Sequence, residues 1–103
     1  MYNSDLNFFK KCYDQLNLIP KGKVTTYAQI AKSLNSKAYR VVGTAMAKNP
    51  SPISIPCHRV VRSDGTIGNY ALGIYKKIEL LKTEGIIIKN NKIVNFNQVL
   101  HIF

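Results

Sequence analysis

A short run near the middle of the chain places a thiol, an imidazole and a guanidinium side by side. The run, Ile55 to Val61, reads Ile-Pro-Cys-His-Arg-Val-Val. The thiolate is the reactive form of a cysteine, and a neighbouring base or cation makes it easier to form. Cys57 is therefore a candidate nucleophile, with His58 as its base. A structural interpretation is also open at this point, because free cysteines are often simply buried in a core.

The charge of the chain indicates what such a site could act on. Fifteen Lys and Arg stand against five Asp and Glu, which gives a formal net charge of +10 at pH 7. Nucleic acid is then the first partner to consider, and a membrane is not, because no stretch approaches the roughly 20 apolar residues of a spanning helix. A length of 103 residues fits one domain with a single modest core.

The N-terminus and the cysteines indicate the compartment. Met1 to Phe9 contains Asp5 and no early basic run, so it does not predict a signal peptide. We expect an intracellular protein, in the cytoplasm or in a nucleus, whose Cys12 and Cys57 are free thiols. Two cysteines and two distant histidines have no recognisable zinc spacing, so we expect neither a metal nor a cofactor.

Helical periodicity predicts the elements before the candidate nucleophile. Apolar residues at helical spacing, after Ser4 and Asp5, predict an amphipathic helix that ends near Leu16, and Cys12 falls on its apolar stripe as a structural residue. Thr26 and Gln29 have the spacing of a capping box, which should start a short helix through Leu34.

A second helix should follow closely and complete a helix-turn-helix. Ser36 can cap it, and it should run from Lys37 to about Lys48. One stripe of this helix combines a long cation with small residues: Arg40, Gly43, Thr44 and Ala47. The stripe is either an ordinary solvated face or, in a basic protein, a face that lies close to nucleic acid with Arg40 reaching in.

The segments around and after the nucleophile are shorter. Asn49 should hold the turn that leaves the helix, and residues 53–55 should form a short extended run that leads to Cys57. A glycine-punctuated loop over residues 67–73 would let backbone donors approach a ligand.

The C-terminal third completes the predicted domain. A longer helix should start near Ile74 and end at Glu84 and Gly85. A hairpin should follow over residues 86–95, and an apolar tail over residues 97–103 should pack on the body. We expect a mainly α single domain over residues 1–103 with a small β-hairpin, similar to a winged helix-turn-helix.

The quoted motifs, in this order, carry a resemblance to a known family. They cover about residues 5 to 86: Gly22-Lys23-Val24-Thr25-Thr26-Tyr27, Arg40-Val41-Val42-Gly43, Asn49-Pro50, Ile55-Pro56-Cys57-His58-Arg59-Val60, Gly68-Asn69-Tyr70 and Leu80-Leu81 before Glu84-Gly85. The chain resembles the C-terminal active domain of the O6-alkylguanine-DNA alkyltransferases, also called methylated-DNA–protein-cysteine methyltransferases. The resemblance also implies that the separate N-terminal domain of that family is missing here.

The resemblance implies a chemistry for five residues. Cys57 would take an alkyl group from O6 of a damaged guanine and keep it, so that each molecule acts once. His58 would deprotonate Cys57 through a water molecule, and Glu84 would orient the imidazole. Tyr27 would protonate the leaving guanine, and Asn49 would tie the helix-turn-helix to the active-site turn.

The resemblance also implies how the base is bound. The backbone carbonyls of Cys57 and Val60 would accept from the guanine amino group, and the N–H of Ala71 would donate toward O6. Tyr70 and Pro52 would form pocket walls. Leu72 stands where the family has a small residue, which predicts that methyl fits and that benzyl is disfavoured.

The implied partner is double-stranded DNA that carries O6-alkylguanine, bound by a monomer. Arg40 would fill the place that the extruded base leaves in the stack, with Thr26, Gly43 and Ala47 on the same surface in the minor groove. Two alternatives are a lesion-binding protein without transfer, against which the presence of Cys57 argues, and a helix-turn-helix regulator. A regulator would instead contact base edges in the major groove.

Overall fold

The computed structural model describes residues 3–103, with side chains from Asn7 onward. The expected roles of Ser4, Asp5 and Leu6 at the start of the first helix therefore lie outside the described side chains. The helices and strands follow in this order: α1 (Asn3–Leu16), β1 (Thr25–Thr26), α2 (Tyr27–Ser33), α3 (Tyr39–Ala47), a 3-10 turn η1 (Cys57–Arg59), β2 (Val60–Val61), α4 (Ile74–Thr83), β3 (Ile88–Lys89), β4 (Lys92–Ile93) and α5 (Phe96–Val99).

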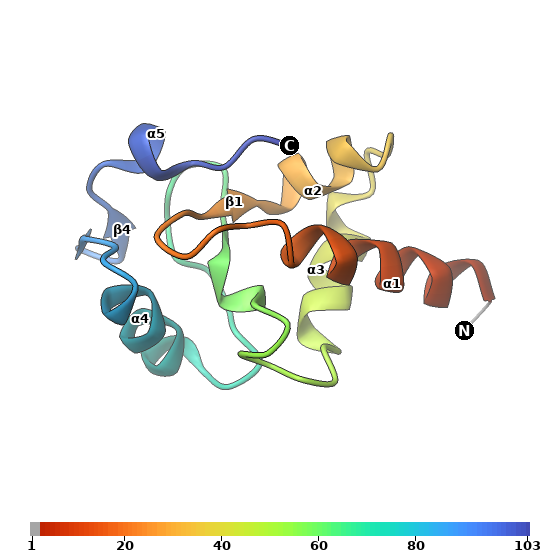
Figure 1. The fold of residues 1–103 in the computed structure, drawn as a ribbon, viewed down its shortest axis with the longest axis horizontal. Coiled ribbons are helices and arrows are strands. Elements are labelled where there is room, and N and C mark those ends of the chain that lie inside the picture. Colours follow the sequence, from red (N-terminus) through yellow and green to blue (C-terminus); the bar gives the residue numbers. More distant parts are fainter. Residues whose placement is uncertain (1–2) are drawn as a thin grey trace.

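The helices gather at two ends of an elongated body. Figure 1 shows α1, α2 and α3 at one end, α4 and the hairpin at the other, and β1 between them. The described part of the chain is mainly helical with a little sheet, which confirms the predicted fold class. Within that part, no helix is long and apolar enough to cross a membrane.

Two apolar cores meet at β2, the strand that follows the 3-10 turn η1 that contains Cys57; η1 is called the nucleophile turn below because it carries the predicted nucleophile. The core of α1, α2 and α3 includes Cys12, Leu16 and Val60. The core under α4 and the hairpin includes Val61 and Leu81. Because β2 contributes one side chain to each core, the turn before it is fixed from both sides.

The helix-turn-helix has the predicted arrangement, with one corrected boundary. Thr26 Oγ1 accepts from Gln29 N–H at 3.0 Å and begins α2. The second helix begins at Tyr39 and not at Lys37, so the predicted start was wrong. Ser36 Oγ accepts from Ala38 N–H at 3.0 Å in a local turn, and Ala38, whose ψ is 54°, is the residue that caps α3.

A parallel pair of short strands, which the sequence did not predict, ties the helix-turn-helix to the nucleophile turn. In this pair Thr25 lies beside Val60 and Thr26 beside Val61. The C-terminal tail packs against the same region, as expected, through hydrogen bonds from Val24 N–H to Val99 O and from His101 N–H to Val24 O. The short helix α5 within this tail was not predicted.

Residues 53–55 form a turn and not the extended run that we expected. Ile53 has a φ of 79°, and Ile55 N–H donates to Ser51 O at 2.9 Å. The predicted hairpin is present, and its turn residues Asn90 and Asn91 have φ values of 52° and 61°. Two adjacent left-handed residues are what a tight type I′ hairpin turn requires.

Candidate active site and DNA-binding surface

Cys57 lies at the start of η1 and borders a small cavity. Its side chain is 3% exposed. The cavity has a volume of about 100 Å³ and is lined by residues from four segments of the chain: Tyr27, Gly43, Met46, Ala47, Cys57, Asn69, Tyr70 and Ala71. Most of the surface that lines the cavity is apolar.

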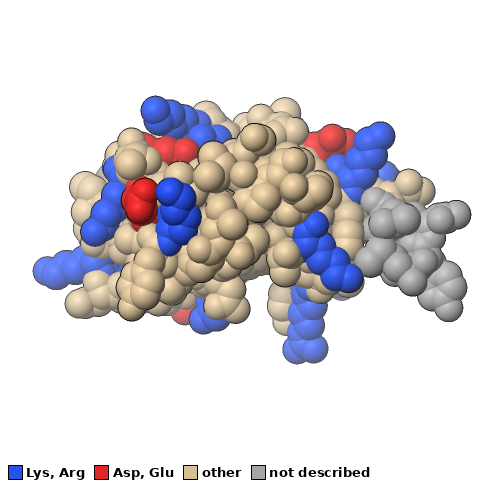
Figure 2. Space-filling view, turned by 90° about the horizontal axis from the view of Figure 1, so that it is seen from below, with Lys and Arg blue, Asp and Glu red and all other residues tan. Residues whose placement is uncertain are grey.

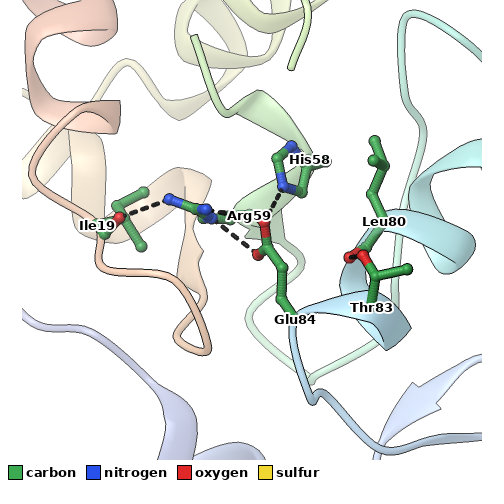
Figure 3. A network of polar contacts seen from close by, with 6 residues as sticks. All are labelled: Ile19, His58, Arg59, Leu80, Thr83 and Glu84. Atoms are coloured by element: carbon green, nitrogen blue, oxygen red, sulfur yellow. Dashed lines mark hydrogen bonds and ion pairs between the residues drawn. The ribbon is translucent and has the colours of Figure 1, made fainter. Parts of the chain in front are cut away.

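An ion network lies behind the nucleophile turn (Figure 3). His58 Nε2 is 2.9 Å from Glu84 Oε2, so the structure brings the predicted base and its orienting carboxylate together. Arg59 donates to both oxygens of Glu84, from Nε at 2.9 Å and from Nη2 at 2.8 Å. Arg59 Nη1 also donates to Ile19 O at 2.8 Å, which ties η1 to the loop after α1. Arg59 had no predicted role.

The network determines which nitrogen of the His58 imidazole carries the proton. Burial lowers the pKa of His58, and the Glu84 carboxylate only partly counteracts this, so the ring is neutral near pH 7. Because Nε2 faces the carboxylate, Nε2 carries the proton and Nδ1 is a free acceptor. Nδ1 is buried and has no hydrogen-bond partner among the described residues. Glu84 is ionised: burial opposes its charge, but the hydrogen bonds from Arg59 and His58 outweigh burial and lower its pKa.

Asn49 clamps the segment that precedes the nucleophile. Its Nδ2 donates to Ile55 O at 2.8 Å, and its Oδ1 accepts from Ser51 N–H at 2.9 Å. Burial raises the pKa of the Cys57 thiol, while the Asn49 amide and the Lys77 charge counteract the rise. Asn49 thus acts on both the shape of the turn and the ionisation of the thiol.

A wider groove continues from the cavity along α3. It has a volume of about 620 Å³ and shares Tyr27, Gly43, Ala47 and Asn69 with the cavity. Arg40 and Arg62 also line it. A side chain at Gly43 would meet nothing within 4 Å, so this glycine leaves open space on α3. The stripe of small residues on α3 therefore forms the floor of a groove that Arg40 and Arg62 also line.

Other predicted site residues lie outside the cavity lining. Val60 is fully buried in the first core, so only its backbone could face a ligand. Pro52 lies in the turn before Cys57 and does not border the cavity. Thr26 is 4% exposed and its hydroxyl caps α2, so the structure does not place it on an open surface.

Leu72 does not have the position that the steric prediction assumed. Its side chain is 49% exposed and does not border the cavity. The backbone makes a turn here, with Gly73 N–H donating to Tyr70 O at 3.0 Å and a φ of 94° at Gly73. Leu72 is a central residue of that turn, and its side chain extends outward.

Lys77 is the site residue that sequence reasoning missed most clearly. It is fully buried on the inner face of α4, and its Nζ donates to Ile67 O at 2.6 Å and to Asn69 O at 2.9 Å. The signal was present: Lys77 follows Ile74 by three residues, in the apolar stripe that Ile78 and Leu81 continue. No group of three or more potential metal ligands occurs within the described part of the chain.

Together, these features define a class of protein: a DNA-binding type of helix-turn-helix domain in which a groove along α3 leads to a buried thiol, next to an imidazole that contacts a carboxylate. Comparison with known proteins gives the family. Residues 7–86 match the family model described as 6-O-methylguanine DNA methyltransferase, DNA binding domain. The chain belongs to this family of DNA-repair alkyltransferases.

Individual relatives agree with this assignment. The chain is 50% identical over 80 residues to a methylated-DNA–protein-cysteine methyltransferase of Thermococcus kodakarensis, a match that spans 77% of this chain and 45% of that protein. It also matches the crystal structure of O6-methylguanine-DNA methyltransferase from Pyrococcus kodakaraensis, with 50% identity and a TM-score of 0.71, over 77% of this chain and 46% of that one. The chain thus spans about half the length of such relatives.

One structural relative is matched over nearly the whole length of both chains. It is Schizosaccharomyces pombe Atl1, solved in complex with damaged DNA that contains O6-carboxymethylguanine. The match has 31% identity and a TM-score of 0.81 and covers 98% of both chains. A protein similar to this chain over nearly its whole length has therefore been solved on a DNA lesion.

Proposed function

We propose that this protein repairs DNA by transferring the alkyl group of O6-alkylguanine to Cys57, and that it does so once per molecule. One observation carries the proposal: the Cys57 thiol borders a small apolar cavity, and a neutral His58, held by Glu84, has a buried Nδ1 with no partner among the described residues. A thiol, an acceptor for its proton and an orienting carboxylate are the parts that thiolate formation needs.

The first step is deprotonation of the thiol. Cys57 and His58 are sequence neighbours, and Nδ1 of His58 has no hydrogen-bond partner among the described residues, the Cys57 thiol included. A water molecule therefore carries the proton from Sγ to Nδ1. The Glu84 carboxylate stabilises the imidazolium that forms. Arg59 keeps that carboxylate ionised and in place through two hydrogen bonds.

The second step is an in-line displacement at the alkyl carbon. A bond forms between Sγ of Cys57 and that carbon, the bond from carbon to O6 breaks, and the electron pair passes to the guanine. Tyr27 supplies a proton to the guanine ring. Burial raises the pKa of Tyr27, and the nearby Arg62 charge counteracts this, so its hydroxyl is protonated at neutral pH and can donate. The imidazolium proton then restores the tyrosine through solvent.

The loop after β2 supplies the contacts that orient the base. Asn69, Tyr70 and Ala71 line the cavity. The backbone N–H of Ala71 donates toward O6, and the carbonyls of Cys57 and Val60 accept from the exocyclic amine. These backbone contacts favour guanine and leave the alkyl carbon facing the thiol.

The groove along α3 accommodates the duplex. Arg40 is exposed on α3 beside Tyr39, with its guanidinium carbon 6.0 Å from the Tyr39 ring centroid. Extrusion of a base costs a few kcal/mol, and a side chain that enters the vacated place offsets part of that cost. Arg40 has the length and exposure for this role, while Gly43 and Ala47 let the backbone approach closely.

The decisive experiment is intact mass measurement after incubation with a duplex oligonucleotide that carries O6-methylguanine. We expect a gain of one methyl group, mapped to the peptide that contains Cys57, and no gain with an unmodified duplex. Cys57→Ala should gain nothing, whereas Cys12→Ala, the matched thiol control, should gain the methyl group normally. Transfer to Cys57→Ala would overturn the proposal.

A second candidate function is lesion binding without transfer. The match to Atl1 over 98% of both chains favours it, because that protein was solved in complex with damaged DNA. If this candidate is right, the protein will bind the methylated duplex more tightly than the unmodified one and its mass will stay unchanged.

A further inference from the structure

Arg62 is the second arginine of the groove along α3, and the proposed steps give it no ligand. Both Arg40 and Arg62 line this groove. Arg40 comes from α3, whereas Arg62 comes from the turn that follows β2, and its side chain is exposed. An exposed guanidinium that lines a groove on a basic protein is a candidate site for an anion.

The guanidinium of Arg62 has no partner among the described residues. The ion pairs in this part of the chain involve other basic residues, namely His58, Arg59 and Lys76. The arginine that donates side-chain hydrogen bonds there is Arg59. Asp64, the nearest carboxylate in the sequence, accepts from Thr66 N–H at 3.0 Å and from Thr66 Oγ1 at 2.7 Å. The charge and the donors of Arg62 are therefore available to a ligand.

Arg62 lies where the groove meets the cavity beside Cys57. Tyr27 and Asn69 line both the groove and the cavity. A side chain at Gly68, next to Asn69, would lie 3.6 Å from Arg62 Nε and 3.6 Å from the Tyr27 hydroxyl. Burial raises the pKa of Tyr27 and the Arg62 charge counteracts the rise, as a guanidinium near the hydroxyl should. Arg62 is thus at the mouth of the cavity.

The turn that carries Arg62 is held in place on both sides. Arg62 N–H donates to Thr66 O at 3.0 Å, and Gly65 N–H donates to Arg62 O at 2.9 Å. Val61, the residue before it, is fully buried. Because the backbone of the turn is already ordered, a ligand of Arg62 does not have to order it on binding.

An extruded nucleotide would bring its phosphates to this place. The cavity has a volume of about 100 Å³ and a mostly apolar lining, which suits a base. Phosphate charges would cost much free energy in such a cavity, so the sugar and its two flanking phosphates stay in the groove at the mouth. A guanidinium suits a phosphate because two parallel N–H groups can bond two of its oxygens.

We propose that Arg62 binds a phosphate that flanks the extruded nucleotide and so holds the strand where its base enters the cavity. The two arginines then have separate tasks. Arg40 enters the vacated place in the base stack, and Arg62 holds the backbone of the base that has left it. The inference rests on the base extrusion of the proposed function and not on its transfer step, because a lesion-binding protein must hold the same strand.

The test pairs the charge of Arg62 with single charges on the DNA. Fluorescence anisotropy gives the affinity for a duplex with one O6-methylguanine, in which the phosphate on the 3′ or the 5′ side of the lesion is replaced by an uncharged methylphosphonate. The Cys57→Ala background prevents transfer during the titration. In this background, Arg62→Gln should weaken binding to the ordinary methylated duplex about three- to tenfold at low salt.

The two changes should not act independently if Arg62 contacts the altered phosphate. The methylphosphonate at that position should weaken the background protein by a similar factor and the Arg62→Gln variant by less than about twofold, because the partner is already gone. Arg40→Gln is the matched control in the same groove, and its loss should multiply with that of the methylphosphonate. Losses that multiply for Arg62→Gln at both flanking phosphates would rule out the contact.

Salt dependence tests whether the contact is ionic. Arg62→Gln should reduce the slope of log affinity against log salt by about 0.9, the contribution of one phosphate of B-DNA, and Arg62→Lys should keep the slope of the background protein. An unchanged slope in Arg62→Gln means that the residue binds no phosphate. Urea unfolding of Arg62→Gln should match the background protein. A variant that loses stability together with affinity would give Arg62 a structural role and contradict the inference.

None of these measurements needs alkyl transfer, so the two proposals fail separately. A protein that shows the coupling but gains no methyl group refutes the proposed transfer and leaves the role of Arg62 intact. A protein that gains the methyl group, but shows no coupling at either flanking phosphate, refutes only the role of Arg62.

Discussion

Replacing Glu84 by glutamine probes the ion network that holds the nucleophile turn. Glu84 receives two hydrogen bonds from Arg59 and faces His58, all at 2.8–2.9 Å, and its side chain is 10% exposed. Hydrogen bonds to charged groups contribute about 1.5–3 kcal/mol each, but glutamine keeps one acceptor oxygen and fits the same space. We therefore expect Glu84→Gln to lose about 2–3 kcal/mol of unfolding free energy at pH 7.

The loss should depend on pH in a defined direction. Burial disfavours the charge on Glu84, yet the hydrogen bonds from Arg59 and His58 outweigh it, and the folded-state pKa is below the ordinary value. Such a carboxylate contributes stability that is present above its unfolded pKa of about 4.3 and is lost as pH falls through the folded pKa. The difference in unfolding free energy between the parent and Glu84→Gln should thus be largest at pH 7 and should disappear in acid.

Urea unfolding at neutral pH and at about pH 3.5 measures both quantities. Glu79→Gln is the matched control, because Glu79 is 65% exposed and forms a surface pair with Lys76 at 3.2 Å. Its loss should stay below about 0.5 kcal/mol at either pH. If Glu84→Gln loses no more than Glu79→Gln at pH 7, the network is not what fixes the turn, and the orienting role of Glu84 falls with it.

Three further predictions concern the groove and the pocket. Arg40→Ala should impair repair of duplex DNA more than reaction with free O6-methylguanine, while Lys82→Ala, on exposed α4 surface, should affect neither; equal losses on both substrates would give Arg40 a structural role. Cys57→Ala should keep the affinity of the parent for methylated duplex within about threefold, measured by fluorescence anisotropy, and a larger loss would mean that the thiol contributes to binding. Leu72→Gly should leave the preference between O6-methylguanine and O6-benzylguanine within about twofold, because Leu72 extends outward from its turn; a marked gain with benzyl would restore the steric role that the sequence predicted.

Local signals were sufficient for the elements that local interactions form. Thr26 caps α2 because its hydroxyl reaches an N–H three residues ahead. The hairpin forms because Asn90 and Asn91 tolerate left-handed backbone. Ser36 misled the prediction because its hydroxyl stabilises a local turn in place of the helix start, and α3 begins two residues later than predicted.

Non-local contacts account for what the sequence could not predict. Thr25 and Val60 pair although they are far apart in the sequence. Strands of two residues are too short to show an alternating pattern, so the sequence could not predict this pairing. Arg59 has its role because tertiary packing brings Glu84 and Ile19 O within reach of one guanidinium. The prediction that Cys57 is the nucleophile, by contrast, rested on the resemblance carried by motifs spread over about residues 5 to 86, and it used no tertiary contact.

The cations near the site change the meaning of the net charge. Arg59 forms an ion pair with Glu84. Lys77 is buried, and its Nζ donates to the backbone carbonyls of Ile67 and Asn69. The formal charge of +10 therefore overstates what is available to phosphate groups. Figure 2 shows basic side chains dispersed over one face, without a continuous patch. Since the salt dependence of binding reports the number of phosphates neutralised, it should correspond to the few arginines and lysines along the groove and not to the whole positive charge of the chain.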